Sequence, residues 1–323
     1  MKRKEISILI IIFLIGICLE ILLSSSDILN SVKFSISIWV NNVFPSLFPF
    51  FVLSELLLNY GFVELISEFL KPLMIKIFKI DSKCSFIFIM SILTGFPSNA
   101  KYTRELYQKK IIDESQATKI LTFTHFSNPL FILGTLSLMF LNNKEVGILI
   151  LIIHYVSNII IGIIFRNYYP TKEKVTKVSV KNAINKMHYY RINNKKNFGI
   201  IITNSLTNTI NTLLLILGII TTFLILTTII DKNINLNNYN QGILNGFIEM
   251  TQGLKYISLL DIPLKFKATL STMILSFGGL SVHMQIISIL SDTNIKYVPF
   301  LTARLLHASI SSITIFTLFD LLI

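Results

Sequence analysis

The residues best suited to bind a ligand in this sequence are charged side chains that stand inside or beside long apolar stretches. Arg304 lies within the last apolar run, where an arginine costs about 2.5–3.5 kcal/mol on insertion scales. Lys101 follows a short apolar run that is interrupted at Gly95 and Pro97. Cationic side chains and the amino ends of interrupted helices attract negative charge. These residues predict a site for a small anion; the alternative for Arg304 is a side chain that extends to the membrane interface.

An acid and several polar residues complete this candidate site. Glu249 could carry a coupled proton or pair with Arg304, or it could lie near a rim of the membrane. Amides and hydroxyls could bond the ligand or join helices. The histidines lack a metal spacing such as His-Glu-x-x-His, so we expect no metal ligands, while His283 and His307 are placed for a proton-coupled role. The candidate substrate-binding residues are Gly95, Pro97, Ser98, Asn99, Lys101, Asn128, Glu249, Gly278, Gly279, Ser281, His283 and Arg304.

The interruption at Gly95 is the element that must position these residues. The apolar run from Cys84 to Phe96 is too short to cross the hydrocarbon core, which takes about 20 helical residues. Pro97 lacks an N–H group and Gly95 frees the backbone, so the run predicts a half-helix with unpaired backbone groups. At membrane depth such groups are tolerated only where protein or water covers them, and secondary transporters build substrate sites from them. A short helix that ends in an ordinary loop is the alternative.

The composition places the chain in a membrane. Hydrophobic residues make up 52% of the sequence and charged residues only 14%, which is too little charge to cover the surfaces of soluble domains. The basic start of the chain precedes an apolar run from Ile6 to Leu23 that resembles a signal peptide. The length of this run and Glu20 within it favour an uncleaved first span with its basic flank in the cytoplasm. Cys18 and Cys84 both lie in apolar runs and predict neither a disulfide framework nor a metal site.

The remaining apolar runs predict an all-α, polytopic integral membrane protein with about eight membrane segments, including broken or re-entrant helices. Two charged stretches differ from the spans: Gly61–Ile80 has the pattern of an amphipathic interfacial helix, and we expect Lys101–Lys119 to lie outside the core. The candidate spans after the first are Phe44–Tyr60, Ile120–Leu141, Val146–Phe165, Ile200–Ile230, Gly242–Leu260, Lys267–Leu290 and Val298–Ile323.

Residues 166–199 form the one long polar segment. They contain nine Lys or Arg residues and a single acid, Glu173, and so supply a net charge of +8 out of +12. Basic segments between spans are the usual mark of a cytoplasmic loop, and anionic lipids are their usual partner. We therefore expect a cytoplasmic loop on the lipid bilayer and no nucleic-acid binding.

The two halves of the chain share a plan that predicts two repeats, 34–165 and 200–323, on either side of the basic loop 166–199 and after an N-terminal span 1–33. Each half has a segment with a carboxylate (Glu55 or Glu249), a glycine-broken segment and a closing span with a histidine (His125 or His307). If the first 165 residues cross four times and Cys84–Phe96 re-enters, the repeats are inverted in the membrane, as in many transporters.

Four motifs give the chain a resemblance to a known family. They are Phe44-Pro45-Ser46-Leu47-Phe48-Pro49-Phe50-Phe51, Thr94-Gly95-Phe96-Pro97-Ser98-Asn99-Ala100-Lys101, Phe126-Ser127-Asn128-Pro129-Leu130-Phe131-Ile132-Leu133-Gly134 and Phe277-Gly278-Gly279-Leu280-Ser281-Val282-His283. In this order they resemble the YlbJ-type sporulation integral membrane proteins of endospore-forming bacteria. The family pattern has Gly-Tyr-Pro-x-Gly-Ala-Lys at the second motif. Here Asn99 stands where that pattern has glycine, which weakens the case for close backbone approach and adds a hydrogen-bonding amide.

The resemblance implies two gate-type, nucleoside-recognition repeats and a transporter of a small organic anion. The anion it implies is dipicolinic acid, exported by the mother cell through its cell membrane or the outer forespore membrane. The alternative is a non-transporting sporulation protein that recruits or scaffolds partners through the basic loop. We find no nucleophile–base motif and no phosphate-binding glycine loop, so we expect neither an enzyme nor a nucleotide-driven pump, and no cofactor. Assembly into a homo-oligomer or with other sporulation proteins stays open.

The basic loop generates a test of topology. A cysteine placed by Ser179→Cys should resist a membrane-impermeant thiol reagent added to intact cells and react after the membrane is opened, because basic loops stay in the cytoplasm. Labelling from outside intact cells would contradict this placement and the inverted-repeat argument built on it.

Overall fold

The computed structural model describes residues 2–323, with side chains from Lys4 onward, and the described residues contain helices and no β-strand. The chain is a polytopic all-α membrane protein, as predicted. Six of the described helices are long and apolar enough to cross a membrane, and shorter apolar helices lie between them. The six are Lys4–Leu23, Ser25–Asn59, Lys144–Asn167, Phe198–Asn233, Leu264–Ile289 and Val298–Leu322.

Several of the helices are short and come in pairs that are separated by a break. The α-helices are α1 (Lys2–Leu23), α2 (Ser25–Ile38), α3 (Phe44–Asn59), α4 (Phe62–Pro72), α5 (Ser85–Thr94), α6 (Ser98–Gln108), α7 (Glu114–Phe123), α8 (Lys144–Ile164), α9 (Val180–Asn193), α10 (Phe198–Asn233), α11 (Asn238–Ile248), α12 (Met250–Leu259), α13 (Leu264–Phe277), α14 (Gly279–Ile289) and α15 (Val298–Leu322). The stretches η1 (Trp39–Val43), η2 (Leu73–Phe78) and η4 (Phe131–Phe140) are π-helical, and η3 (Ser82–Cys84) and η5 (Phe165–Asn167) are single 3₁₀ turns.

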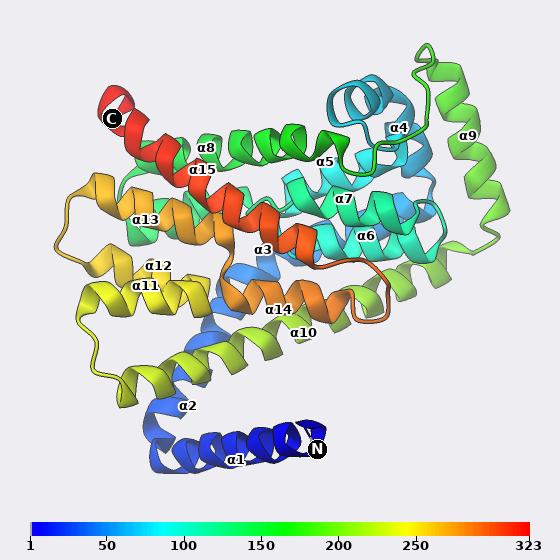
Figure 1. Cartoon of the computed structure of the whole chain (residues 1–323). Helices are drawn as coiled ribbons and strands as arrows, with labels where there is room; N and C mark the ends of the chain where they lie inside the picture. Colours follow the sequence, from blue (N-terminus) through cyan, green and yellow to red (C-terminus); the bar gives the residue numbers. More distant parts are fainter. Residues whose placement is uncertain (1) are drawn as a thin grey trace.

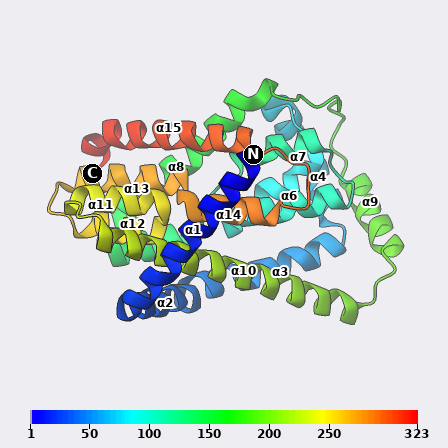
Figure 2. The ribbon, with the colours of Figure 1, turned by 60° about the horizontal axis from the view of Figure 1, so that its bottom comes forward.

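Helix α1 lies at the edge of the molecule, where it touches α2 and α10 (Figure 1). Its isoleucine and leucine side chains are exposed along the helix, which suits contact with lipid acyl chains. Figure 2 brings α1 to the front and shows it crossing the bundle obliquely. The prediction of a first span is confirmed by its length and composition.

Two long helices form the frame of the molecule. α2, η1 and α3 run as one helix that packs along α10, a helix of 36 residues and therefore about 54 Å long. Hydroxyl groups join the two: Ser35 Oγ lies 2.8 Å from Thr221 Oγ1, and Trp39 Nε1 donates to the carbonyl oxygen of Leu213 at 2.9 Å. Small polar residues of this kind hold helices together in lipid, where the hydrophobic effect does not.

The first two helix breaks support each other. α5 ends at Gly95, which has a φ of 78°, and the Phe96–Pro97 peptide bond before α6 is cis. The second break separates α7 from the helix that begins at Pro129. Asn128 joins the two breaks, because its Nδ2 donates to the carbonyl oxygen of Thr94 at 3.0 Å and its Oδ1 accepts the Leu130 N–H at 2.7 Å. A Cβ at Gly95 would collide with the backbone of Asn128, so only glycine fits there.

The third and fourth breaks form a second pair. α11 and α12 are separated at Glu249, whose Oε2 caps α12 by accepting the Gln252 N–H at 2.8 Å. α13 and α14 are separated at Gly278 and Gly279, which have φ values of 94° and 67°. A Cβ on Gly279 would lie 3.1 Å from the N atom of Met250, so the backbone of the fourth break lies directly against that of the third.

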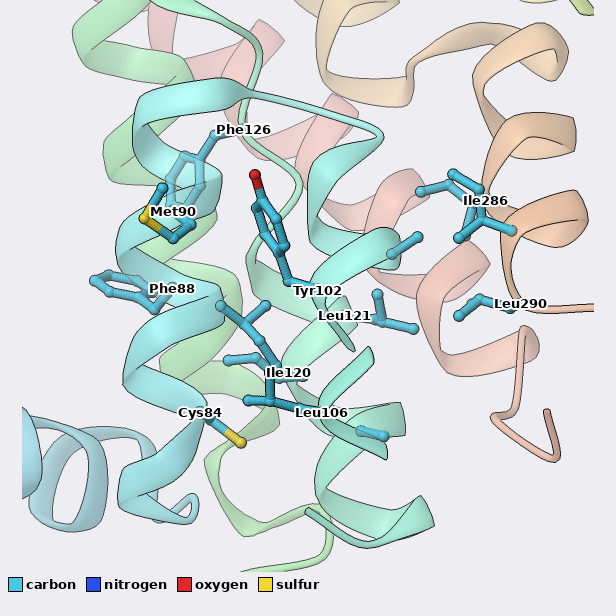
Figure 3. Packing of buried hydrophobic residues seen from close by; sticks show 14 of the residues in the cluster. Cys84, Phe88, Met90, Tyr102, Leu106, Ile120, Leu121, Phe126, Ile286 and Leu290 are labelled. Atoms are coloured by element: carbon cyan, nitrogen blue, oxygen red, sulfur yellow. The ribbon is translucent and has the colours of Figure 1, made fainter. Parts of the chain in front are cut away.

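The two pairs of breaks meet at His125. Its ring stacks on Phe96 with centroids 4.5 Å apart, and its Nε2 would lie 2.9 Å from a Cβ at Gly278. Side chains of α5, α6 and α7 pack together and against Ile286 of α14 (Figure 3). The breaks are thus buried in the interior, which contains two hydrophobic core clusters.

The two halves have the same order of elements with opposite directions. In the first half a long helix (α2–α3) is followed, after α4, η2 and η3, which have no counterpart in the second half, by the hairpin α5–α6, the broken helix α7–η4 and α8 (Figure 1). In the second half α10 is followed by the hairpin α11–α12, the broken helix α13–α14 and α15. This arrangement pairs the Gly95 hairpin with the Glu249 hairpin, and His154 of α8 with His307 of α15. The sequence pattern instead compared Gly95 with Gly278 and His125 with His307.

Two expectations about single segments are wrong. Ile120–Leu141 is not one span, because Pro129 lacks an N–H and residues 124–128 leave the helix. Gly242–Leu260 is not one span but a hairpin broken at Glu249. Lys101–Lys119 contains α6 and α7, most of whose side chains are buried in the protein, and Lys119 Nζ donates to two backbone carbonyl oxygens, of Lys79 and Arg166. Its expected place outside the hydrocarbon core stays a prediction.

The stretch expected to be an interfacial helix forms α4 and η2, and its polar face is covered by the basic segment. Glu68 is buried and accepts hydrogen bonds from Lys71 of its own helix at 3.0 Å and from Lys186 of α9 at 3.4 Å. Asn194, which follows α9, donates to the carbonyl oxygen of Asn59 at 2.9 Å. Residues 166–199 are therefore docked on the first half of the molecule, with their other lysines exposed.

The hairpin α11–α12 generates a test of packing. Gly253→Ala should lower stability by about 1–3 kcal/mol, because its new Cβ would collide with the Cα of Gly246 across the hairpin. Gly218→Ala in α10 is the matched control; nothing lies within 4 Å of its new Cβ, so it should be neutral or gain up to about 1 kcal/mol. The unfolding temperature in detergent measures both. Equal effects of the two changes would contradict the tight hairpin.

Candidate functional site

A small cavity lies where the four breaks come together. It is lined by Pro97 of the first break, Asn128 of the second, Glu249 of the third and Gln285 on the helix after the fourth. Residues of α2–α3 and α10 close its remaining sides. Its volume is about 70 Å³. The cavity thus has walls from both halves of the chain, as a site between repeats requires.

Helix amino ends dominate the electrostatics of this cavity. α6 begins directly after Pro97, a helix begins directly after Asn128, and α12 begins directly after Glu249. Such ends carry partial positive charge and N–H groups without helical partners. Two of these N–H groups are capped by the side chains of Asn128 and Glu249 themselves. The cavity therefore favours negative charge, and one negative charge is built into it as Glu249.

Glu249 is the only titratable residue that lines the central cavity within the described part of the chain. Its side chain is buried, with the residue 2% exposed, and it sits between α11 and α12. The predicted pairing of Glu249 with Arg304 is wrong, because Arg304 bonds other groups. The alternative that Glu249 lies near a rim of the membrane stays open.

Arg304 is a structural residue of the core. It is 0% exposed; its Nη2 donates to the carbonyl oxygen of Thr122 at 2.5 Å and to Asn158 Oδ1 at 3.1 Å. Its Nη1 lies 2.9 Å from Nδ1 of His307, and the other ring nitrogen of His307 lies 2.9 Å from the carbonyl oxygen of His154. Arg304 therefore ties α15 to the end of α7 and to α8. It does not line the cavity and does not extend to an interface.

Lys101 is also placed away from the central cavity. Its Nζ donates to Glu55 Oε1 at 2.7 Å, and the Phe51 ring lies 5.0 Å from that nitrogen. This buried ion pair joins α6 to α3. Lys101 faces a second, larger cavity instead.

The other predicted residues near the first break act on the backbone. Ser98 Oγ donates to the carbonyl oxygen of Gly95 and accepts from Thr94 Oγ1, which closes the turn. Asn99 is fully buried, and neither atom of its amide finds a hydrogen-bond partner among the described residues. The amide expected to bind ligand at this position therefore points into protein.

The predicted residues near the fourth break also have structural roles. Gly278 and Gly279 shape the chain, and Ser281 is buried behind the cavity wall. His283 Nδ1 lies 2.6 Å from Oη of Tyr297, and its Nε2 lies 3.0 Å from the carbonyl oxygen of Phe277. Both ring nitrogens of His283 are thus engaged in packing α14. Of the twelve residues predicted for the site, Pro97, Asn128 and Glu249 line the cavity.

Sequence reasoning missed several cavity residues. Gln285, Thr251 and Ser127 line it, and so does Asn42 of η1, whose Nδ2 donates to Thr135 Oγ1 at 2.7 Å. Each is a polar residue within or beside an apolar stretch, and neither Gln285 nor Asn42 has a break beside it. One feature could have indicated Gln285: it follows the Gly278–Gly279 break by two helical turns.

A wide cavity lies on one side of the central one. It is lined by Glu55 and Lys101, by Arg104 and Asp292, and by the α10 residues Asn208–Leu215, and its volume is about 610 Å³. Arg104 bonds Asp292 through Nε at 2.7 Å and Nη2 at 2.5 Å. The Arg104 guanidinium holds the pKa of Asp292 below its usual range. The lining of this cavity is therefore polar and carries both positive and negative charges.

A third cavity lies on the opposite side. It is lined by Asp27 and Phe34 of α2, by Thr228–Lys232 of α10 and by Lys255 of α12, and its volume is about 580 Å³. Along α10 the three cavities follow one another, at Asn208–Leu215, at Ile216 and Ile220, and at Thr228–Lys232. Two wide polar cavities are thus separated by a narrow central one.

Comparison with known proteins agrees with this architecture. Residues 40–144 match the family model described as Gate: nucleoside recognition. The chain is 34% identical over 310 residues to the sporulation integral membrane protein YlbJ of Bacillus subtilis (strain 168), covering 88% of this chain and 76% of that protein. This chain belongs to the YlbJ family of sporulation integral membrane proteins. No solved structure matches it.

The YlbJ family assignment confirms the resemblance seen in the four motifs. The gate match runs from η1 to the start of α8 and so includes the first two breaks and Asn128. The second gate-type repeat stays a prediction. The chain is a multi-pass integral membrane protein of this sporulation family, as expected.

The buried arginine of this YlbJ family member generates a test that separates fold from binding. Arg304→Lys should lower stability by about 3 kcal/mol, because a lysine cannot reach the acceptors on Thr122, Asn158 and His307 together. Arg104→Lys is the control, since its partly exposed pair contributes little. The unfolding temperature in detergent measures both. A silent Arg304→Lys would contradict the structural role.

Proposed function

We propose that this chain is a membrane transporter of a small organic anion rather than an enzyme. The observation that carries the proposal is the convergence of four helix breaks on one central cavity. Broken helices with their ends at a central site are the way secondary transporters bind substrate. The gate match in the first half supports the same class of protein.

The three cavities along α10 support a carrier that opens to one side at a time. The central cavity is narrow, about 70 Å³, against about 610 and 580 Å³ on its two sides. An open channel would be continuous, whereas a carrier closes around its site. The hairpin α5–α6 lines the central cavity with Phe96 and Pro97 of its turn and the first outer cavity with residues of α6, and α12 lines both the central and the second. Each hairpin is therefore the gate of its own side.

Dipicolinic acid is the substrate we propose. It is a flat aromatic ring with two carboxylates, so it needs apolar walls and donors at its ends. Phe96 and Phe131 supply apolar wall, while Asn128 and Gln285 and the adjacent helix amino ends supply donors. The sporulation name of the relative supports a substrate of spore formation, in the cell membrane or the outer forespore membrane.

The orientation follows from the basic segment. If residues 166–199 are cytoplasmic, the end of α8 and the start of α10 face the cytoplasm (Figure 1). The cavity with Lys101 and Arg104 then opens to the cytoplasm, and the cavity with Asp27 opens to the opposite side. The basic start of α1 lies on the same side as α9, which is the placement that its charge predicts. Exposed lysines of 166–199 would rest on anionic lipid.

The proposed site generates a transport test. Liposomes that contain the purified chain should take up radiolabelled dipicolinate, and Gln285→Leu should raise the half-saturation concentration about tenfold to hundredfold. The reason is the loss of one hydrogen bond to a charged carboxylate from a side chain in the cavity wall.

The control for this test is Asn240→Leu, an exposed amide of α11 outside the three cavities. It should transport like the unaltered chain. Absence of dipicolinate uptake or exchange by the unaltered chain would contradict the proposal. A requirement for 166–199 in recruiting another sporulation protein would then favour the scaffold role.

A further inference from the structure

We propose that Glu249 is the proton-binding residue that couples anion transport to a proton gradient. The inference rests on the proposed function and adds to it the co-transported ion and the residue that carries it. Its basis is the position of one carboxylate in the wall of a narrow cavity whose helix ends otherwise favour an anion.

The surroundings of Glu249 leave its charge without a neutralising partner. One carboxylate oxygen accepts the backbone N–H of Gln252 at 2.8 Å, and no ion pair to Glu249 is formed among the residues described. The residue is 2% exposed. The groups that stabilise this buried carboxylate, the amino end of α12 and the hydroxyl group of Thr251, carry no full charge.

The titratable groups on the elements packed against this hairpin are engaged elsewhere. On α10, Asp231 accepts from Asn245 at 2.9 Å, and on α14, His283 bonds Tyr297 and the carbonyl oxygen of Phe277. On α12, Lys255 lies over the Phe34 ring, 4.5 Å from its centroid. The remaining such groups are Lys232 beside Asp27, Tyr256 bonded to Asp231 and Gln252, Lys265 paired with Asp320, and Lys267 bonded to the carbonyl oxygen of Ser258.

An anionic substrate in the same cavity changes the balance at Glu249. Two negative groups in a narrow, buried space repel strongly, because the protein interior screens charge poorly. A proton on Glu249 removes this repulsion and lets its carboxyl group donate a hydrogen bond to the substrate. Substrate and proton therefore strengthen each other's binding by the same factor. A carrier that moves only its fully loaded and empty forms then transports the two together.

A neutral Glu249 also changes the gate. The ionised carboxylate caps α12 and so holds the tip of the hairpin α11–α12 in place. Protonation weakens the cap at the hairpin that separates the central cavity from the cavity lined by Asp27 and Lys255. The proton therefore acts on the affinity of the site and on the gate of one side.

The test uses the purified full chain in liposomes, with the membrane potential held at zero by potassium and valinomycin. Two quantities are measured: exchange of labelled dipicolinate at equal pH on both sides, and accumulation driven by an imposed pH gradient. The unaltered chain should exchange dipicolinate and accumulate it about tenfold per pH unit for one coupled proton. Glu249→Gln, which mimics the protonated carboxyl, should keep exchange, lose its pH dependence and accumulate no substrate.

Two further variants and one binding measurement complete the design. Glu249→Asp should keep accumulation, because it keeps a carboxyl group, and Glu145→Gln, an exposed acid of α8, should match the unaltered chain. In weakly buffered detergent solution, dipicolinate should make the unaltered chain take up about one proton per bound substrate, which tests the inference even if Glu249→Gln fails to fold.

The outcomes separate the two proposals. Exchange without pH-driven accumulation by the unaltered chain, accumulation by Glu249→Gln, or a requirement for a sodium gradient would overturn the role of Glu249 while transport itself stands. No exchange of dipicolinate by the unaltered chain would overturn the proposed function, and the coupling inference with it.

Discussion

The structure depends on one constraint: backbone N–H and C=O groups freed at a helix break need partners wherever water is excluded. This chain solves it by placing the breaks against one another. Asn128 of the second break bonds the carbonyl oxygen of Thr94 at the first, and Phe96 N–H donates to the Phe126 carbonyl oxygen at 2.7 Å. Gly279 of the fourth break touches Met250 at the third. The first two breaks thus satisfy each other and the third and fourth pack against each other, so all four lie together and border a common cavity.

The same constraint explains why the charged residues of the core divide into two classes. Arg304 donates to a backbone carbonyl oxygen that the end of α7 leaves free, and Lys119 donates to two that the ends of η2 and α8 leave free. Both residues therefore stabilise helix ends from outside the cavity. Lys101 joins α6 to α3 through Glu55. Glu249 instead faces the cavity itself. A charged residue in an apolar run is therefore important, but its hydrogen-bond partners decide whether it stabilises the frame or contacts the ligand.

The sequence predicted much of the frame and less of the site, for a physical reason. Length and hydropathy are local, so α1, α8, α10 and α15 follow from them, and so do the breaks at Gly95 and Gly278. The break after Phe123 was not predicted, because the bonds that stabilise it, from the Ser127 N–H to His154 and from Asn128 to Thr94, join residues that lie far apart in sequence. The pairing of Glu249 with Arg304 failed because Arg304 bonds Thr122 and Asn158, which lie far away in sequence, whereas Glu249 caps its own helix. Gln285 could not be singled out, since a lone amide in an apolar helix indicates packing as readily as binding.

The two hairpins occupy matching places in the halves but carry different groups at their tips. The tip of α5–α6 consists of Gly95, Phe96 and Pro97, which cannot change charge, whereas the tip of α11–α12 is Glu249. Each hairpin separates the central cavity from one outer cavity. A repeat with equal gates would open to either side with equal ease. If the hairpins act as the proposed gates, one ionisable group at one tip breaks that symmetry, because the state of a single carboxyl then affects the closure of one side only.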